Sequence, residues 1–183
     1  MKHFPIIYND PVIEHVLEQY ADQLGDDFQK YRSHVYRVFH YTLFLIRKSS
    51  HLTNAIREQV ALAAAFHDIG IWTHQTLDYI KPSIDEMKKY IGDSPHYKLI
   101  AGMIFWHHKT SPYFGKYQLI IESFRRADWI DVTKRMKTFG VPSEFTEELT
   151  AVFPYHNFHY TLMKLSFRHI LKHPFAPFAM FKN

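Results

Sequence analysis

The chain has 183 residues, of which 46% are hydrophobic and 22% charged, a composition typical of a folded globular chain and not of a disordered one. It contains no cysteine, which excludes disulfides, thiolate zinc sites, iron–sulfur clusters and a cysteine nucleophile, whereas its 14 histidines could hold a metal together with carboxylates. The net charge of +4 is too small to indicate nucleic-acid binding, and without a signal-peptide core or a membrane-length apolar run we expect a cytoplasmic location and no membrane association.

In chain order, the predicted elements are helices. Asp10 can cap a first helix that has Pro11 at its first position and ends near Gly25. The next two predicted helices span about 27–48 and 53–67, because apolar residues recur in both at helical spacing. The remaining predicted helices run from a Ser83–Glu86 capping box to Gly92, from Ser94–Pro95 to His108, from 119 to 136, after Ser143 and after Asn157.

No segment alternates as a strand, and the chain shows no internal repeat, low-complexity tract or linker. We therefore expect an all-α fold in a single domain, 1–183, with a core over about 27–133 and C-terminal helices, 143–173, packed on it. The stretch 168–182 mixes basic and aromatic residues. Because prolines interrupt it, we expect it to pack on the bundle or across a homodimer, not to bind a membrane or nucleic acid.

The most informative local pattern is the end of the helix predicted over 53–67. An apolar, alanine-rich run leads into His67 and Asp68, and Gly70 follows. Adjacent helical residues diverge by about 100°, so both side chains can reach one ion only where a helix ends. The pattern indicates a buried metal site at a helix terminus, although a surface pair is the alternative.

Other helices direct similar side chains inward. His34 lies in an apolar stripe, Asp128 lies on an apolar face, and His107 continues another such face with His108 beside it. A buried imidazole or carboxylate needs a partner or a cation. The alternatives are a hydrogen-bonded core histidine and an ordinary salt bridge for Asp128.

In this order, His34, His67–Asp68 and Asp128 resemble the H…HD…D signature of the HD-domain metal-dependent phosphohydrolase superfamily. The segment 34–38 is similar to the family's first-ligand helix, including an arginine three residues after the histidine. The segments 66–70 and 126–131 are similar to its central and last motifs. The resemblance covers about 27–133 and implies a helical bundle of the HD-domain type with a central metal site.

The resemblance implies that His34, His67, Asp68 and Asp128 bind a divalent ion. Two imidazoles and two carboxylates suit Mn²⁺, Fe²⁺, Co²⁺, Ni²⁺ or Zn²⁺, with Mg²⁺ also conceivable. Asp68 would also act in catalysis by taking a proton from the attacking water. The implied activity is hydrolysis of a phosphate ester or anhydride in a small molecule or nucleotide.

Four residues are predicted to contact the substrate: Arg37, His107, His108 and Lys109. Arginine and histidine supply donors for a phosphoryl group, so we expect Arg37 and the histidine pair to face the open side of the ion. His107 and His108, with His96, could instead hold a second ion.

Other residues near the motifs carry weaker predictions. Asp131 could orient a ligand, and His74, Asp78 and Tyr79 lie in a predicted loop after the central motif. His40 and His51 have no spacing that indicates a functional role.

Two other classes of function stay open. One is different HD-type metal chemistry, namely hydration, lyase chemistry or dinuclear-iron oxygenation. The other is a non-catalytic, metal-bound sensor or interaction module. The cyclic-dinucleotide phosphodiesterase branch is disfavoured because no Gly-Tyr-Pro element follows the histidine pair.

Overall fold

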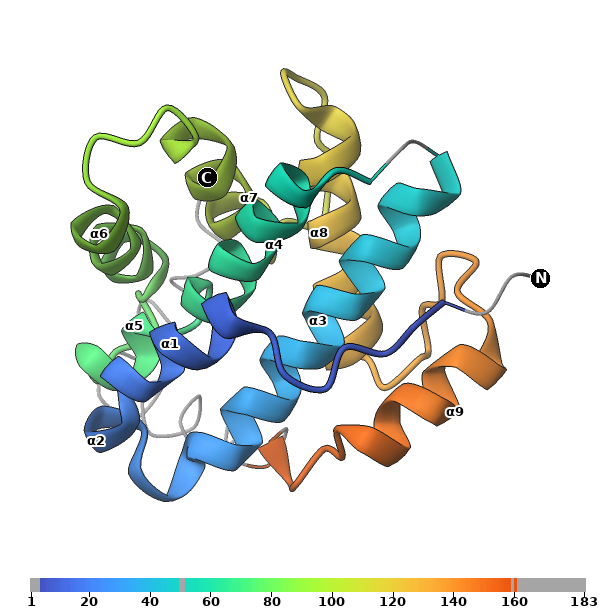
Figure 1. Ribbon diagram of the computed structural model, residues 1–183, viewed down its shortest axis with the longest axis horizontal. Coiled ribbons are helices and arrows are strands. Elements are labelled where there is room, and N and C mark those ends of the chain that lie inside the picture. The colour runs from blue at the N-terminus through green and yellow to red at the C-terminus, as the bar shows by residue number, and fades with distance from the viewer. Residues whose placement is uncertain (1–3, 50–51, 159, 161–183) are drawn as a thin grey trace.

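The computed structural model describes residues 4–49, 52–158 and 160, and throughout these ranges the regular secondary structure is helical (Figure 1). The predicted all-α class is therefore confirmed for the described part of the chain. The elements are α1 (Pro11–Gln19), α2 (Ala21–Leu24), the 3₁₀ helix η1 (Gly25–Asp27), α3 (Phe28–Ser49), α4 (Asn54–Phe66), α5 (Gly70–Thr73), α6 (Ile80–Ile91), α7 (Tyr97–Trp106), α8 (Gln118–Val132) and α9 (Ser143–Val152).

Side-chain caps set the first residue of two helices. Asp10 accepts hydrogen bonds from the backbone nitrogens of Val12 (3.0 Å) and Ile13 (3.3 Å), as expected for an N-cap with proline next to it. Thr53 caps α4 by accepting from the nitrogen of Ile56 at 3.2 Å. The first predicted helix is interrupted at Tyr20 and ends as the separate, short α2.

The predicted Ser83 cap is wrong, because α6 begins at Ile80 and places Ser83 inside the helix. Its hydroxyl accepts a hydrogen bond from the backbone nitrogen of Gly70 at 2.9 Å. Glu86 accepts from the hydroxyl of Tyr20 at 3.0 Å. Tertiary contacts with Gly70 and Tyr20 thus use the two side chains that a local capping box would have used.

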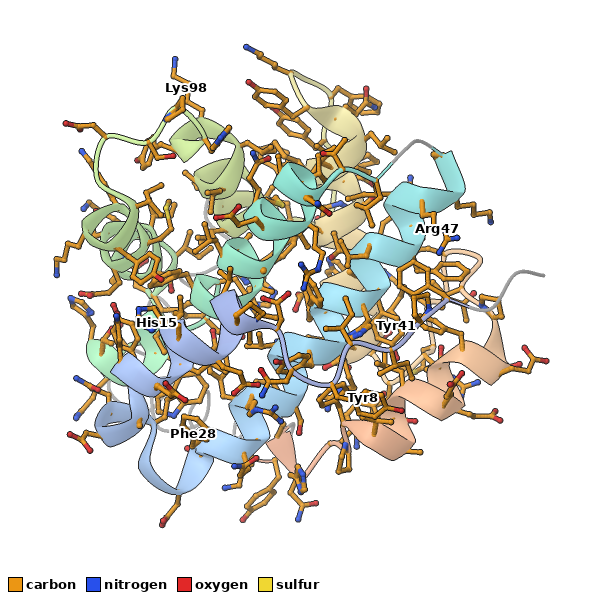
Figure 2. All side chains as sticks on the ribbon, in the orientation of Figure 1. Tyr8, His15, Phe28, Tyr41, Arg47 and Lys98 are labelled. Carbon is orange, nitrogen blue, oxygen red and sulfur yellow. The ribbon has the colours of Figure 1, made fainter. Side chains whose placement is uncertain are left out.

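Helix α3 runs through the middle of the bundle, with α4 and α8 packed against it (Figure 1). Helix α7 packs against α4, α6 and α8, and α1 lies against α4. Charged side chains such as Arg47 and Lys98 project outward from this arrangement (Figure 2). The helices α3, α4, α7 and α8 therefore enclose the centre of the molecule.

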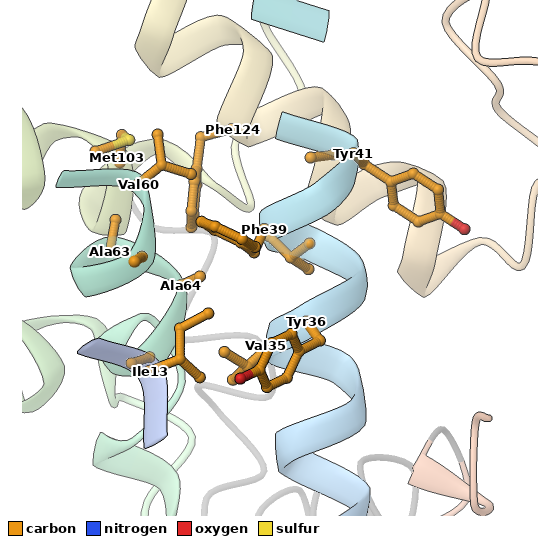
Figure 3. Packing of buried hydrophobic residues seen from close by; sticks show 14 of the residues in the cluster. Ile13, Val35, Tyr36, Phe39, Tyr41, Val60, Ala63, Ala64, Met103 and Phe124 are labelled. Atoms are coloured by element: carbon orange, nitrogen blue, oxygen red, sulfur yellow. The ribbon is translucent and has the colours of Figure 1, made fainter. Parts of the chain in front are cut away.

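The hydrophobic core fills the space between these helices. Figure 3 shows Val35 and Phe39 of α3 facing Val60 and Ala64 of α4, with Phe124 above them. Small residues at 63–65 of α4 are fully buried, which lets neighbouring helices approach closely. None of the helices in the described ranges is long and apolar enough to cross a membrane.

The structure does not describe the stretch 168–182, so the prediction for this basic and aromatic segment lies outside the described residues. Nearly all of the helix predicted after Asn157 also lies outside the described residues. Helix α9 is the described part of the predicted C-terminal region, and Phe145 in it stacks on Phe44 of α3 with ring centroids 5.0 Å apart.

Candidate metal centre

Three segments bring the predicted ligands together: His34 from α3, His67 and Asp68 from the turn after α4, and Asp128 from α8. The Nε2 atoms of His34 and His67 lie 2.9 Å apart, and each lies 3.5 Å from Oδ2 of Asp68. Asp128 Oδ1 lies 3.7 Å and 3.9 Å from the same two nitrogens. Ligands about 2.1 Å from one ion are separated by roughly 3–4 Å, so the atoms of His34, His67 and Asp68 fit a single ion, and Asp128 lies beside this group.

Hydrogen bonds fix which nitrogen of each ring carries a proton. His34 Nδ1 lies 2.7 Å from Oδ2 of Asp131, and His67 Nδ1 lies 2.7 Å from the carbonyl oxygen of Ala64. A carboxylate and a carbonyl only accept, so Nδ1 is the donor in both rings and Nε2 of the neutral ring holds a lone pair. Two lone pairs 2.9 Å apart repel each other, and a shared cation or proton removes that repulsion.

The electrostatics of the two rings differ accordingly. Burial lowers the pKa of His34, but hydrogen bonds to Asp131 and Asp68 outweigh it and raise the pKa to about 9. Burial lowers the pKa of His67 to about 4. Without an ion, Nε2 of His34 therefore carries a proton, which it shares with Nε2 of His67. A metal ion that binds here would have to displace this proton.

Several buried carboxylate oxygens lack a hydrogen bond, which tests whether a cation fits here. Asp68 Oδ1 and both oxygens of Asp128 accept no hydrogen bond from the described residues. Burial raises the pKa of both carboxyls, but neighbouring histidines reverse the shift, so both stay ionised. An unsatisfied buried charged group costs more than the roughly 1–3 kcal/mol of a neutral one, and a bound cation would remove that cost.

A second group of ligand-type side chains shares Asp68 with the first. Asp68, His107 and His108 each offer one ligand atom, and these atoms lie within 4.8 Å of one another. His107 Nε2 lies 3.3 Å from Oδ1 of Asp68, and His107 Nδ1 lies 2.5 Å from the carbonyl oxygen of Ile104. The histidine pair therefore lies at the centre, where the sequence predicted it.

The turn at 67–70 depends on contacts that the rest of the fold supplies. The hydroxyl of Tyr31 donates to the carbonyl of Ala65 at 2.9 Å and accepts from the nitrogen of Asp68 at 3.3 Å. A Cβ at Gly70 would lie only 2.5 Å from the carbonyl oxygen of Tyr79. Glycine is therefore required at this position of the motif so that α5 can approach the start of α6.

Arg37 requires a correction, because it does not face the open side of the centre. Its side chain is fully buried, and Nε and Nη2 donate to the two oxygens of Asp131 at 2.5 Å and 2.9 Å. Nη1 donates to the carbonyls of Phe153 (3.0 Å) and Pro154 (2.9 Å). Arg37 thus holds Asp131, which in turn holds His34, and the predicted substrate contact is replaced by a positioning role.

Lys109 is also buried, and its substrate contact stays a prediction. Its Nζ lies 5.0 Å from the ring centroid of Phe105, and burial lowers its pKa. Its carbonyl oxygen accepts from Arg125 Nη1 at 3.1 Å and from Trp129 Nε1 at 3.3 Å. These bonds anchor the chain directly after His108.

Apart from Asp131 and Tyr79, the weaker candidates lie outside the groups at the centre or outside the described residues. His96 and His74 are exposed, and neither belongs to a group of metal-type side chains in the described part of the chain. His96 precedes α7, whereas His107 follows the other end of that helix. Asp78 is exposed, and His51 lies outside the described residues.

Two aromatic residues also lie at the centre: Tyr79, which carried only a weak prediction, and Phe158, which the sequence did not indicate. Tyr79 places its hydroxyl against His108 Nε2 in a short hydrogen bond and 3.4 Å from His107 Nε2. Phe158 stacks on His34 with ring centroids 4.3 Å apart. Neither residue has a spacing relation to the motifs, because each reaches the centre from a loop or segment that tertiary packing brings back.

Access to the centre is uneven. The side chains of His34, His67, Asp68, His107 and Asp128 are 0–3% exposed, whereas that of His108 is 15% exposed. Among these side chains, that of His108 is therefore the most exposed to solvent.

No family model, curated protein or solved structure matches the chain.

Proposed function

We propose that the chain is an HD-type metal-dependent hydrolase, which cleaves a phosphate ester or anhydride of a small molecule or nucleotide with water as the nucleophile. One observation carries the proposal: two imidazole Nε2 atoms lie 2.9 Å apart beside buried carboxylate oxygens that lack hydrogen bonds with the described residues. The order of His34, His67–Asp68 and Asp128 along the chain agrees with the resemblance to that superfamily.

The chain's residues support such chemistry in distinct ways. A divalent ion bound here would lower the pKa of a water molecule and offset charge on a phosphoryl oxygen. Asp68 stays ionised and directs Oδ2 to the first group and Oδ1 to His107, so it can join two ions and accept a proton from the attacking water. We therefore propose two ions that share Asp68.

The shared carboxylate also favours a second candidate, a dinuclear-iron oxygenase. Two groups of ligands joined by Asp68 suit a pair of irons as well as a pair of redox-inactive ions. Iron content and oxygen consumption separate the two functions, because hydrolysis consumes no oxygen.

The test combines metal analysis with substrate screening. Purified protein would be analysed for bound metal and assayed for phosphate release from a panel of nucleotides and phosphate esters with Mn²⁺, Fe²⁺, Co²⁺, Ni²⁺ or Zn²⁺. We expect bound metal, metal-dependent turnover, and loss of both in Asp128→Ala. Asp78→Ala, which removes an exposed carboxylate outside the centre, is the matched control. Phosphate release that persists after chelation would contradict the proposal.

A further inference from the structure

The histidines of the centre do not all present the same nitrogen. His34, His67 and His107 have Nδ1 at 2.5–2.7 Å from a carboxylate or carbonyl oxygen, which leaves Nε2 to face the centre. His108 is turned the other way. Its Nε2 meets the hydroxyl of Tyr79, and its Nδ1 lies 3.3 Å from Oδ2 of Asp128.

The backbone around Tyr79 fixes the place of that hydroxyl. The carbonyl oxygen of Tyr79 accepts from the nitrogen of Ser83 at 2.8 Å and lies against Gly70, where a Cβ could not fit. The side chain is 2% exposed. The phenol oxygen is thus held beside His108 by main-chain contacts at the start of α6.

We propose that Tyr79 is a positioning residue of the metal centre: its hydroxyl accepts the Nε2 proton of His108, so that the lone pair of His108 Nδ1 is available to an ion shared with Asp68 and His107. An imidazole that is protonated at Nε2 has its lone pair at Nδ1, so one hydrogen bond decides which nitrogen is available. The inference rests on the proposed two-ion function, because it names the atom through which His108 would serve the second ion.

The phenol acts here as a neutral partner. A phenol has an ordinary pKa of about 10, so the oxygen keeps its proton at neutral pH. The competing arrangement has His108 bind through Nε2, with the Tyr79 hydroxyl displaced from it. The two arrangements put the imidazole proton on different nitrogens, so they can be told apart directly.

The first measurement locates that proton. Protein labelled with ¹⁵N-histidine and loaded with Zn²⁺, which is diamagnetic, would be studied by long-range ¹H–¹⁵N NMR, with His108 assigned from the spectrum of His108→Gln. We expect the proton on Nε2 of His108 and on Nδ1 of His34, His67 and His107. A proton on Nδ1 of His108 would overturn the inference.

The second measurement removes the hydroxyl. Calorimetric titration of metal-free Tyr79→Phe with Zn²⁺ should show the second equivalent bound about 10–100-fold more weakly than in the wild type, with the first equivalent retained. Tyr41→Phe is the matched control: Tyr41 is buried, its hydroxyl has no hydrogen-bond partner among the described residues, and it lies on the side of α3 away from α4 in Figure 3. Its titration should match the wild type.

The outcomes separate the inference from the function on which it rests. Wild-type affinity for the second equivalent in Tyr79→Phe would overturn the role of Tyr79. If the wild type binds a single equivalent while His108 is protonated on Nε2, the two-ion function fails and the orientation by Tyr79 stands. Melting temperatures of both phenylalanine variants would show that the comparison is made on folded protein.

Discussion

Helix α3 carries two fully buried histidines, six residues apart, whose surroundings differ in kind. His40 Nε2 accepts a hydrogen bond from the backbone nitrogen of Ile7 at 2.8 Å, and its Nδ1 lies 2.7 Å from the carbonyl oxygen of Tyr36. His34 has Nδ1 bonded to Asp131, while its Nε2 faces Nε2 of His67 at 2.9 Å. The main chain satisfies both nitrogens of His40, whereas His34 leaves one for a cation.

The two rings show that burial alone does not separate a structural histidine from a candidate ligand. Both are 0% exposed, yet the pKa of His40 is lowered to about 4 and that of His34 is raised to about 9. What differs is the chemistry of the partners, since uncharged backbone groups suit a neutral ring and carboxylates attract a cation. Three predictions test this distinction.

The largest effect is expected for Asp68→Ala. The variant removes the carboxylate that both candidate metal groups share, so turnover on an active phosphate substrate should fall at least about 10⁴-fold and bound metal should decrease. Steady-state kinetics and metal analysis would measure both. His40→Ala is the matched control, for which we expect wild-type metal content and a lower melting temperature. Full turnover in Asp68→Ala, or metal loss in His40→Ala, would contradict the comparison.

A smaller effect is expected for Asp131→Ala, which acts on His34 indirectly. The change removes the partner of His34 Nδ1 and leaves the buried guanidinium of Arg37 without its carboxylate. Loss of one member of a buried ion pair destabilises a protein by about 3–5 kcal/mol, and loss of a carboxylate behind a metal-bound histidine weakens metal affinity about 10–100-fold.

Chemical denaturation and metal titration of Asp131→Ala would measure the two effects. A second variant, Arg37→Met, serves as the comparison, because it keeps Asp131 beside His34 but removes the guanidinium. We expect it to lose stability while retaining metal better than Asp131→Ala. Equal metal affinity in the two variants would argue against an orienting role for Asp131.

Much of the fold follows from local sequence signals. The helical spacing of apolar residues predicts α3 and α4, and the cap at Asp10 sets the start of α1. The break after Gln19 and the start of α6 at Ile80 were not predicted. The start of α6 is accompanied by a contact between distant elements, the bond from Gly70 to Ser83, which single-sequence patterns do not encode.

The candidate centre was predictable to the extent that its residues follow motifs. His34, His67, Asp68 and Asp128 could be named because ligand-type side chains interrupt apolar faces in a known order. Arg37 was misplaced because helical spacing gives its neighbourhood but not its partner, Asp131 on α8. Tyr79 and Phe158 reach the centre through loops and packing, for which the sequence contains no periodic signal.

The smallest predicted effect is the pH dependence that His40 gives to stability. Burial lowers its pKa, the bond to Tyr36 opposes this shift, and the charge of Arg57 lowers the pKa further, to about 4 from the ordinary value of 6.5. As the pH falls below 6.5 the unfolded chain takes up a proton at this position before the folded protein does. The stabilising contribution of His40 is therefore present above pH 6.5 and is lost as the pH falls toward 4. Between pH 7 and pH 5 the loss in the free energy of unfolding is about 2 kcal/mol.

His40→Gln isolates this contribution, because a glutamine oxygen can still accept from Ile7 but does not titrate. Urea unfolding of chelator-treated wild type and variant at pH 7 and pH 5 should show that the stability advantage of the wild type shrinks by about 2 kcal/mol. The raised pKa of His34 has the opposite sign: its contribution is full below pH 6.5 and is lost as the pH rises through about 9. Since His34 is common to both proteins, it cancels in their difference. A difference that does not change between the two pH values would show that the main-chain contacts of His40 do not hold the ring neutral, and the contrast between the two histidines would then rest on geometry alone.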